Sequence, residues 1–278
     1  MSNQSQIALK VNDAYFTSEE TAGWCRERLV EYGWVGEGKV VLEPCVGSGQ
    51  LVKGLPGTVI GCDLIDHGFP GVVVEDYLLV GERRVDCVFT NPPFGRMGSL
   101  ALKVMSKAME ESDRVAMILP ASFRKISMVD KINPWFHPVY DEVCPNLMYE
   151  LPNGEVRKVM TIFQMWERKD RRRVRVKDLL HYSQYMKRVN KEDAEYAFRT
   201  QGASAGKVLN GLNYNPASTA FLKGSEERLR SHDWTNIASF TAGIPAIGLM
   251  DVSYGLMLED KGIDIGVYLR KGVTSTMM

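Results

Sequence analysis

The sequence has no excess of charge of either sign. Its 278 residues include 34 Lys and Arg and 34 Asp and Glu, so the net charge at pH 7 is zero. A wholesale basic coat is therefore excluded, and a nucleic-acid-binding protein with this balance must concentrate its positive charge locally. The chain also lacks an apolar run of the signal-peptide kind and any stretch of membrane-spanning length. We therefore expect a cytoplasmic protein.

Residues arranged for metal binding are also missing. The five cysteines are scattered without a Cys-x-x-Cys pair, and the four histidines show no metal-ligand spacing. This pattern favours a reducing compartment and argues against a structural zinc site. Nothing resembles a hydrolytic triad either. The hydrophobic content of 45% is ample for a packed core. We expect a globular protein without a metal.

What the chain does contain is a buried strand that stops at a stiff polar turn. In the stretch 86–90, three apolar residues and a β-branched one run directly into Asn91-Pro92-Pro93-Phe94. The two prolines have fixed φ and no backbone N–H, and Pro92 restricts Asn91 to an extended conformation. The turn therefore holds the Asn91 amide and nearby carbonyls as preset acceptors, followed by an aromatic ring.

This arrangement suits the binding of an exocyclic amino group on a flat ring. The lone pair of such an amine is conjugated into the ring, so the amine is a poor nucleophile. Two acceptors, the Asn91 amide and the Pro92 carbonyl, would favour a pyramidal nitrogen, while Phe94 stacks on the base and Pro93 stiffens the turn. The alternative interpretation is an ordinary strand-ending turn, because Pro-Pro is common in loops.

A second motif lies upstream. A short apolar strand at 39–42 leads into Glu43-Pro44-Cys45-Val46-Gly47-Ser48-Gly49. A strand, an acidic residue, closely spaced glycines and then a helix start are typical of a nucleotide-binding turn of the Rossmann kind. The pattern departs from the dinucleotide fingerprint, because no third glycine follows three residues later. The Pro44-Cys45 pair could suggest the cysteine nucleophile of enzymes that methylate carbon 5 of cytosine. That thiolate has to lie at the turn that binds the substrate, which here is Asn91-Pro92-Pro93-Phe94, so we exclude this interpretation.

Together the two motifs resemble those of S-adenosylmethionine (AdoMet)-dependent amino-methyltransferases, especially the adenine-modifying enzymes of bacteria and their phages. The first motif of that family is an acidic residue, Pro, two residues, then Gly-x-Gly, and Asn-Pro-Pro-Phe follows some forty residues later. The resemblance covers roughly the first 168 residues. Within these motifs, the resemblance implies cofactor-binding roles for Glu43, Pro44, Gly47, Gly49 and Asn91.

The resemblance implies further cofactor contacts. Phe16 and Thr17 match the aromatic-Thr step that closes over the methionine end of AdoMet, although Ser18 stands where family enzymes often have Pro. Asp63 ends the next strand, where an acid accepts from the ribose hydroxyls, and Asp66 is its rival. Asp76 falls where the family places an acceptor for the adenine amino group of the cofactor.

Short apolar strands alternate with helical stretches, which indicates an α/β fold. We expect a Rossmann-like methyltransferase sheet with helices on both faces and an antiparallel terminal hairpin. Helices are predicted from Thr17, which has capping-box spacing to Glu20, to about Tyr32 and over 99–109. The predicted strands are 39–42, 58–63, 71–77, 86–90, 115–120, 136–143 and 159–166. Residues 1–168 would form the catalytic domain.

The region 169–278 is expected to be a small α+β target-recognition region. Its strands are predicted at 182–189 and 194–199, and its helices near Glu226 and Leu249. A dense basic run opens it and is either a solvated linker or a source of phosphate contacts. The loop 202–208 is one residue short of a phosphate-binding P-loop, so we reject nucleoside triphosphate binding. The expected nucleic-acid-binding residues are Arg171, Arg172, Arg173, Arg175 and Lys207.

The sequence therefore predicts an enzyme that transfers a methyl group from AdoMet to the 6-amino group of adenine. The base would be flipped into the Asn-Pro-Pro-Phe pocket, with DNA favoured over RNA. No metal is needed, because a sulfonium methyl is already activated. Two alternatives remain: an amino-methyltransferase acting on adenine or guanine of RNA, or on glutamine in proteins, and a non-catalytic regulator that binds AdoMet or nucleic acid.

Overall fold

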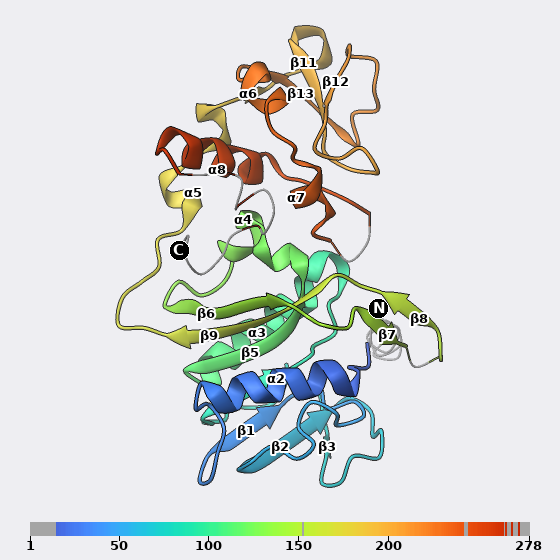
Figure 1. Cartoon of the computed structure of the whole chain (residues 1–278), viewed down its shortest axis with the longest axis vertical. Coiled ribbons are helices and arrows are strands. Elements are labelled where there is room, and N and C mark those ends of the chain that lie inside the picture. The colour runs from blue at the N-terminus through green and yellow to red at the C-terminus, as the bar shows by residue number, and fades with distance from the viewer. Residues whose placement is uncertain are drawn as a thin grey trace. The chain divides into compact units, whose positions relative to one another are not determined.

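The computed structural model describes residues 15–151, 153–241 and 244–263, together with 265, 268 and 272. The chain divides into two compact units (Figure 1). Unit 1 consists of the chain up to Pro120 and of Trp135–Arg172, and unit 2 consists of Ala121–Pro134 and the chain from Arg173 onward. No helix in the described ranges is long and apolar enough to cross a membrane.

Unit 1 is built on a seven-stranded sheet with the order β3-β2-β1-β4-β5-β9-β6. The first five strands in this order are parallel, and β9 is antiparallel to both β5 and β6. The strands are β1 (Val40–Glu43), β2 (Thr58–Asp63), β3 (Val73–Val74), β4 (Cys87–Thr90), β5 (Arg114–Pro120), β6 (Phe136–Val143) and β9 (Thr161–Arg168). The prediction of a Rossmann-like sheet with an antiparallel terminal hairpin is confirmed.

Two long helices accompany this sheet. Helix α2 (Glu19–Glu31) buries Ala22, Cys25 and Leu29 in one apolar cluster with Phe89 of β4 and Phe163 of β9. Helix α3 (Ser99–Glu111) contacts β5. Its buried side chains include those at the predicted positions Ala101, Met105, Ala108 and Met109. Strand β4 is buried along its whole length, as expected of a central parallel strand.

The helix predicted after the glycine turn is absent from the described structure. Residues 50–54 form turns, in which the Val52 and Lys53 N–H groups both donate to the Gly49 carbonyl. Gly54 follows with φ 73°, which interrupts helical geometry before β2 begins. The loop therefore has room for a single turn only, and the prediction of a helix N-terminus at this site is wrong.

Two element boundaries also differ from the prediction. Helix α2 is capped by Ser18, whose hydroxyl accepts from the Thr21 N–H, so Thr17 is not the N-cap. This shift leaves the Thr17 side chain free to contact the strand-ending turn. The third strand is only two residues long, because both residues of β3 are exposed at the sheet edge.

A small hairpin is inserted between β6 and β9. It pairs β7 (Met148–Glu150) with β8 (Val156–Lys158) in antiparallel register. The Phe16 N–H donates to the Glu150 carbonyl, so the hairpin holds the segment that precedes α2. Buried Tyr149 shares a 2.6 Å hydrogen bond between its hydroxyl and that of Thr161 in β9, which anchors the hairpin to the sheet.

Unit 2 contains a four-stranded sheet with the order β10-β13-β11-β12. Its strands are β10 (Lys187–Arg188), β11 (Tyr196–Arg199), β12 (Val208–Leu209) and β13 (Thr219–Lys223). Its helices are α4 (Ile126–Val129), α5 (Val176–Leu179), α6 (Glu226–Arg230), α7 (Thr235–Ser239) and α8 (Leu249–Asp260), with 3₁₀ turns at Ala121–Arg124, Tyr182–Gln184 and Lys191–Asp193.

The predicted helices near Glu226 and Leu249 are confirmed, and so is the strand ending at Arg199. The predicted strand 182–189 is wrong over its first half, where a 3₁₀ turn forms because the His181 side chain accepts from the Ser183 N–H. Sequence reasoning also did not foresee that Ala121–Pro134 belongs to the same unit as the C-terminal region.

Candidate active site

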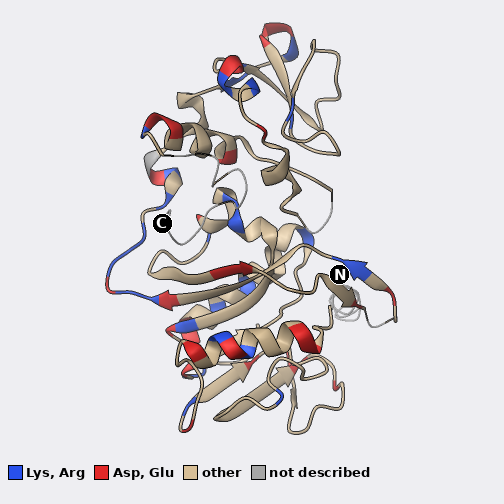
Figure 2. Ribbon diagram, viewed as in Figure 1, with Lys and Arg blue, Asp and Glu red and all other residues tan. Residues whose placement is uncertain are grey.

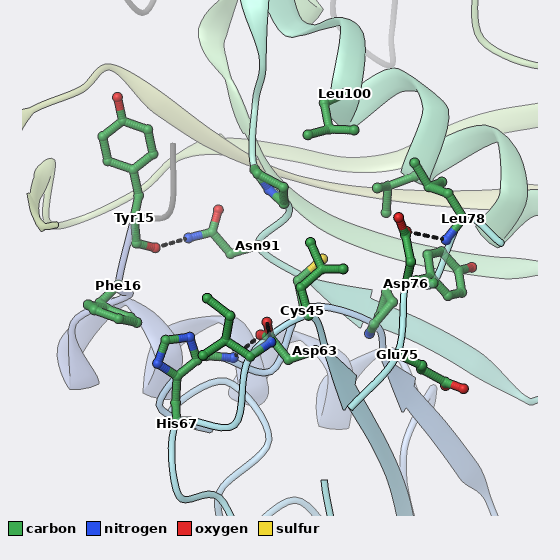
Figure 3. Close-up of a pocket in the computed structure, with 17 residues that line it drawn as sticks. Tyr15, Phe16, Cys45, Asp63, His67, Glu75, Asp76, Leu78, Asn91 and Leu100 are labelled. Carbon is green, nitrogen blue, oxygen red and sulfur yellow. Dashed lines mark hydrogen bonds between the residues drawn. The ribbon is translucent and has the colours of Figure 1, made fainter. Parts of the chain in front are cut away.

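The carboxyl ends of the parallel strands border a cavity that opens to solvent (Figure 3). Such strand ends are where ligands bind in open α/β sheets. The cavity brings together seven of the predicted site residues. They are Phe16, Pro44, Gly47, Asp63, Asp76, Asn91 and Pro93.

A smaller cavity of about 260 Å³ adjoins it and shares Phe16, Gly47 and Asn91 as lining residues. Thr17 and Gln50 complete its polar wall. The Gln50 Oε1 atom is buried and has no hydrogen-bond partner. Residues from both sequence motifs and from the segment before α2 therefore meet at one place, although more than seventy positions separate the first from the last.

The Asn91 side chain is held in one orientation. Its Nδ2 donates to the Tyr15 carbonyl at 2.9 Å (Figure 3). It also donates to the Thr17 hydroxyl at 3.0 Å. Its Oδ1 is buried and has no partner. Because an unsatisfied buried acceptor costs free energy, such an atom in a cavity wall is expected to meet a donor on a ligand. A flip of the amide would break both of the Nδ2 bonds.

Asp63 connects β2 to the glycine turn. Its Oδ2 accepts from the Gly47 N–H at 2.8 Å, and its Oδ1 accepts from the Ile65 N–H at 3.2 Å. Each carboxylate oxygen retains a further lone pair, so Asp63 can still accept from ligand hydroxyls. Its rival Asp66 lines neither cavity and accepts from the Gly68 N–H in an exposed turn.

A buried network supports the other end of the large cavity, where Asp76 lies. The Asp76 Oδ1 accepts from the Leu78 N–H at 3.1 Å. Its neighbour Tyr77 donates its hydroxyl to Glu111 Oε2 at 2.8 Å, and Lys107 lies 3.3 Å from Glu111 Oε1. Burial and the Glu111 carboxylate raise the pKa of Tyr77 well above its ordinary value. A fully buried carboxylate at the end of α3 thus fixes the loop that carries Asp76.

Glu43 lies wholly buried beneath the turn and does not line the cavity. Its Oε1 accepts from the Cys45 N–H at 3.0 Å, and its Oε2 has no partner. Burial raises the pKa of Glu43 to about 8, against smaller lowering contributions from the Thr90 hydroxyl and the Cys45 amide. At pH 7 the neutral form therefore predominates, and a cation nearby would favour its ionisation.

Two predicted residues have surroundings that sequence reasoning did not foresee. Phe94 is only 3% exposed and stacks on Tyr15, with ring centroids 5.3 Å apart and an interplanar angle of 23°. A base can reach this ring only if Tyr15 moves. At Gly49, an added Cβ would lie 2.0 Å from the Phe69 ring, so the close approach that requires glycine is made by that ring.

The basic run after β9 is coloured blue in Figure 2. Its positions are divided between exposed and buried. Arg171 and Arg172 are exposed. Arg173 is only 4% exposed and donates to the carbonyls of Val129 and Ile132, so its guanidinium is occupied inside unit 2 and does not fit the predicted phosphate contact. Burial lowers the pKa of Arg173. Nearby Arg175 pairs with Asp178 at 3.0 Å.

Lys207 lies in unit 2 on an open, polar cavity that also contacts Arg230, His232 and Asp233. Its position is compatible with the expected phosphate contact, although Arg230 is already paired with Glu226 at 2.8 Å. Among the residues that the structure describes, no group of three or more His, Cys, Asp or Glu could hold a metal ion.

Sequence reasoning missed Tyr15, His67 and Tyr77 as cavity residues. The signal for Tyr15 was its place beside the Phe16–Thr17 step, and Tyr77 directly follows Asp76. His67 had no local signal. It reaches the cavity because its ring packs edge-on against Phe16, at a centroid distance of 5.6 Å.

No protein-family model matches the chain, and none of the curated proteins does. Solved structures do show similarity. PH1948 from Pyrococcus horikoshii, provisionally named an RNA methyltransferase, is 22% identical over 56% of this chain and 87% of that one, with a TM-score of 0.46. The magnesium protoporphyrin IX methyltransferase ChlM from Synechocystis PCC 6803, solved with bound SAM, is 13% identical over 60% and 92%, with a TM-score of 0.41.

The 23S rRNA methyltransferase ErmE is 15% identical over 62% of this chain and 76% of that one, with a TM-score of 0.40. At these identities and scores the similarities say nothing of this chain's activity. Its chemistry has to follow from the residues around the two cavities.

Proposed function

We propose that this protein transfers a methyl group from AdoMet to the 6-amino group of adenine in a nucleic acid, with DNA favoured over RNA. The observation that carries the proposal is the Asn91 amide, whose nitrogen is held by two acceptors while its buried oxygen has no partner. An exocyclic amino group offers only hydrogens, so it needs an acceptor of this kind. Asn91 Oδ1 and the Pro92 carbonyl would orient the amine.

The donors and acceptors around the large cavity fit AdoMet. Asp63 would accept from the ribose hydroxyls and Asp76 from the adenine amino group, as the resemblance to amino-methyltransferases implies. Phe16, Thr17 and the glycine turn would enclose the methionine end in the smaller cavity. When bound, the cofactor would supply a methyl group already activated on a sulfonium.

Positioning would supply most of the rate enhancement. Asn91 orients the amine, and the stiff turn fixes the line of approach between nitrogen and methyl carbon. No general base is assigned, because the product ammonium is acidic and loses its proton after transfer. A base within a duplex has to leave the stack to reach Asn91, at a cost of roughly a few kcal/mol.

Nucleic-acid contacts are proposed at Arg171, Arg172 and Lys207, whose side chains are exposed. Region 169–278 would supply target recognition. Since the whole chain has no net charge, these local cations would account for most of the dependence of binding on salt.

The test is methyl transfer from labelled AdoMet to unmethylated duplex DNA, single-stranded DNA and RNA in parallel, with mass spectrometry of the nucleosides. We expect 6-methyladenine in duplex DNA. The same product in RNA alone would favour the alternative of an RNA methyltransferase. AdoMet binding without transfer to any polymer would overturn the nucleic-acid enzyme and favour a protein substrate or a non-catalytic binding module.

A further inference from the structure

Met97 has an unusual backbone conformation close to the candidate active site. Its φ is 55° and its ψ is 30°, in the left-handed region that bulky side chains disfavour. In the described part of the chain, Met97 and Ser225 are the two residues other than glycine with positive φ. The Ser225 hydroxyl bonds to the Tyr185 carbonyl, which accounts for its geometry. An outlier of this kind beside an active site suggests a function for the side chain.

The turn that imposes this conformation is tightly fixed. The N–H groups of Leu100 and Ala101 both donate to the Phe94 carbonyl, at 3.1 Å and 3.3 Å, and the Gly98 N–H donates to the Gly95 carbonyl at 3.2 Å. At Gly95, where φ is 68°, an added Cβ would lie 2.7 Å from Leu100 Cβ. Met97 therefore stands at the tip of a closed turn, three residues after Phe94.

The side chain at this tip points into solvent. Met97 is 85% exposed and exceeds every other exposed large apolar residue in the described ranges, the next being Leu79 at 83%. Arg96, its neighbour on the same turn, is also exposed. The structure thus maintains an apolar side chain outside the core, in a disfavoured backbone conformation, with a cation beside it.

Proteins that unstack bases frequently use a side chain with these properties. When a base leaves the stack, apolar side chains such as methionine can enter between the remaining base steps. Methionine is unbranched and flexible, so it can adapt to the gap. An adjacent arginine can contact the phosphate of the strand it enters.

We propose that Met97 is a wedge that enters the base stack of a double-stranded nucleic acid while the target base occupies the pocket at Asn91. This inference rests on the proposed function. It assigns the turn Arg96–Gly98 as an interaction surface for duplex nucleic acid, with Arg96 contacting its backbone.

The test uses Met97→Gly in the full chain. Glycine adopts positive φ readily, so we expect a higher melting temperature together with about a tenfold lower transfer rate on paired duplex, because the wedge side chain is lost. The fluorescence of 2-aminopurine at the target position should report less extrusion. Val30→Ala, which shortens an exposed apolar side chain on α2 that lines neither cavity, serves as the control and should leave the rate unchanged.

A target base placed opposite an abasic site needs little help to leave the stack, so Met97→Gly should act on it at nearly the wild-type rate. Equal rates of wild type and Met97→Gly on paired duplex would overturn the wedge while leaving the proposed function intact. Failure of the wild-type protein to modify any nucleic acid would overturn both.

Discussion

Two regions rich in polar side chains use them in opposite ways. At the carboxyl edge of the unit 1 sheet, the buried atoms Gln50 Oε1 and Asn91 Oδ1 have no hydrogen-bond partner. In the basic stretch that leads into unit 2, Arg173 donates to two backbone carbonyls and Arg175 pairs with Asp178. The first region retains unused hydrogen-bonding capacity, and much of the second is satisfied by the protein itself.

This difference indicates which of the two regions binds a ligand. A buried acceptor without a donor is costly, so a fold retains one where a ligand supplies the donor. A cation already bound to carbonyls or carboxylates contributes to stability and is poorly available to phosphate. Charge density in the sequence alone does not separate these cases, and the predictions below test the distinction from the largest expected effect to the smallest.

Asn91→Ala should give the largest effect. Removal of one of the two proposed acceptors of the amine should lower the transfer rate by about a thousandfold, the upper end for one preorganised polar group. AdoMet affinity, measured by calorimetry, should stay within a few-fold of wild type. Loss of both together would instead place Asn91 in the cofactor site.

Thr17 should act through Asn91. Thr17→Val removes an acceptor of the Asn91 Nδ2 hydrogens and should lower the rate at saturating AdoMet by about tenfold, the equivalent of one hydrogen bond. Thr17→Ser keeps the hydroxyl and should restore most of the rate. If Val and Ser variants lose activity equally, the orienting role of Thr17 is wrong.

Glu111 should affect cofactor affinity rather than chemistry. Glu111→Gln weakens the support of the loop that carries Asp76, so we expect AdoMet to bind about fivefold more weakly, the loss expected for one weakened charged contact. The rate at saturating AdoMet should remain near that of wild type. A fall in rate with unchanged affinity would contradict this role.

The arginines should separate into two groups. Arg171→Ala combined with Arg172→Ala should weaken DNA binding and reduce the slope of log affinity against log salt by up to about two, one for each phosphate contact. Arg173→Ala should instead lower the melting temperature, because its buried bonds to Val129 and Ile132 are lost. If the double variant has an unchanged salt slope, Arg171 and Arg172 do not contact nucleic acid.

The last prediction concerns stability and not methyl transfer, and it is the pH dependence due to Glu43. Its folded pKa of about 8 lies above the ordinary 4.5, so the folded protein retains a proton that the unfolded chain releases. This contribution to stability is complete below about pH 4.5 and is lost as the pH rises towards 8. Melting temperatures between pH 5 and 8 should therefore fall more steeply in wild type than in Glu43→Gln, and parallel curves would contradict the shifted pKa.

Local sequence patterns were sufficient for much of the fold. Strand Thr58–Asp63 was predicted to the residue, and α3 was predicted from its apolar spacing because that spacing follows the helical period. The helix after Gly49 could not be judged locally, since the ring of Phe69 that lies against Gly49 acts through packing. Likewise, Ser18 and Thr17 are both plausible caps in sequence, and only the contact of Thr17 with Asn91 decides between them.

The sequence by itself determined the order of the strands along the chain and the stiff turn at Asn91, because backbone restriction and periodicity are local properties. The tertiary structure alone decided which polar atoms remain unpaired. Asn91 acquires its orientation from Tyr15 and Thr17, more than seventy residues away. Arg173 is unavailable to a phosphate because its guanidinium donates to carbonyls of α4 and of the turn after it. Hydrogen-bond satisfaction depends on distant partners in space, which no local pattern specifies.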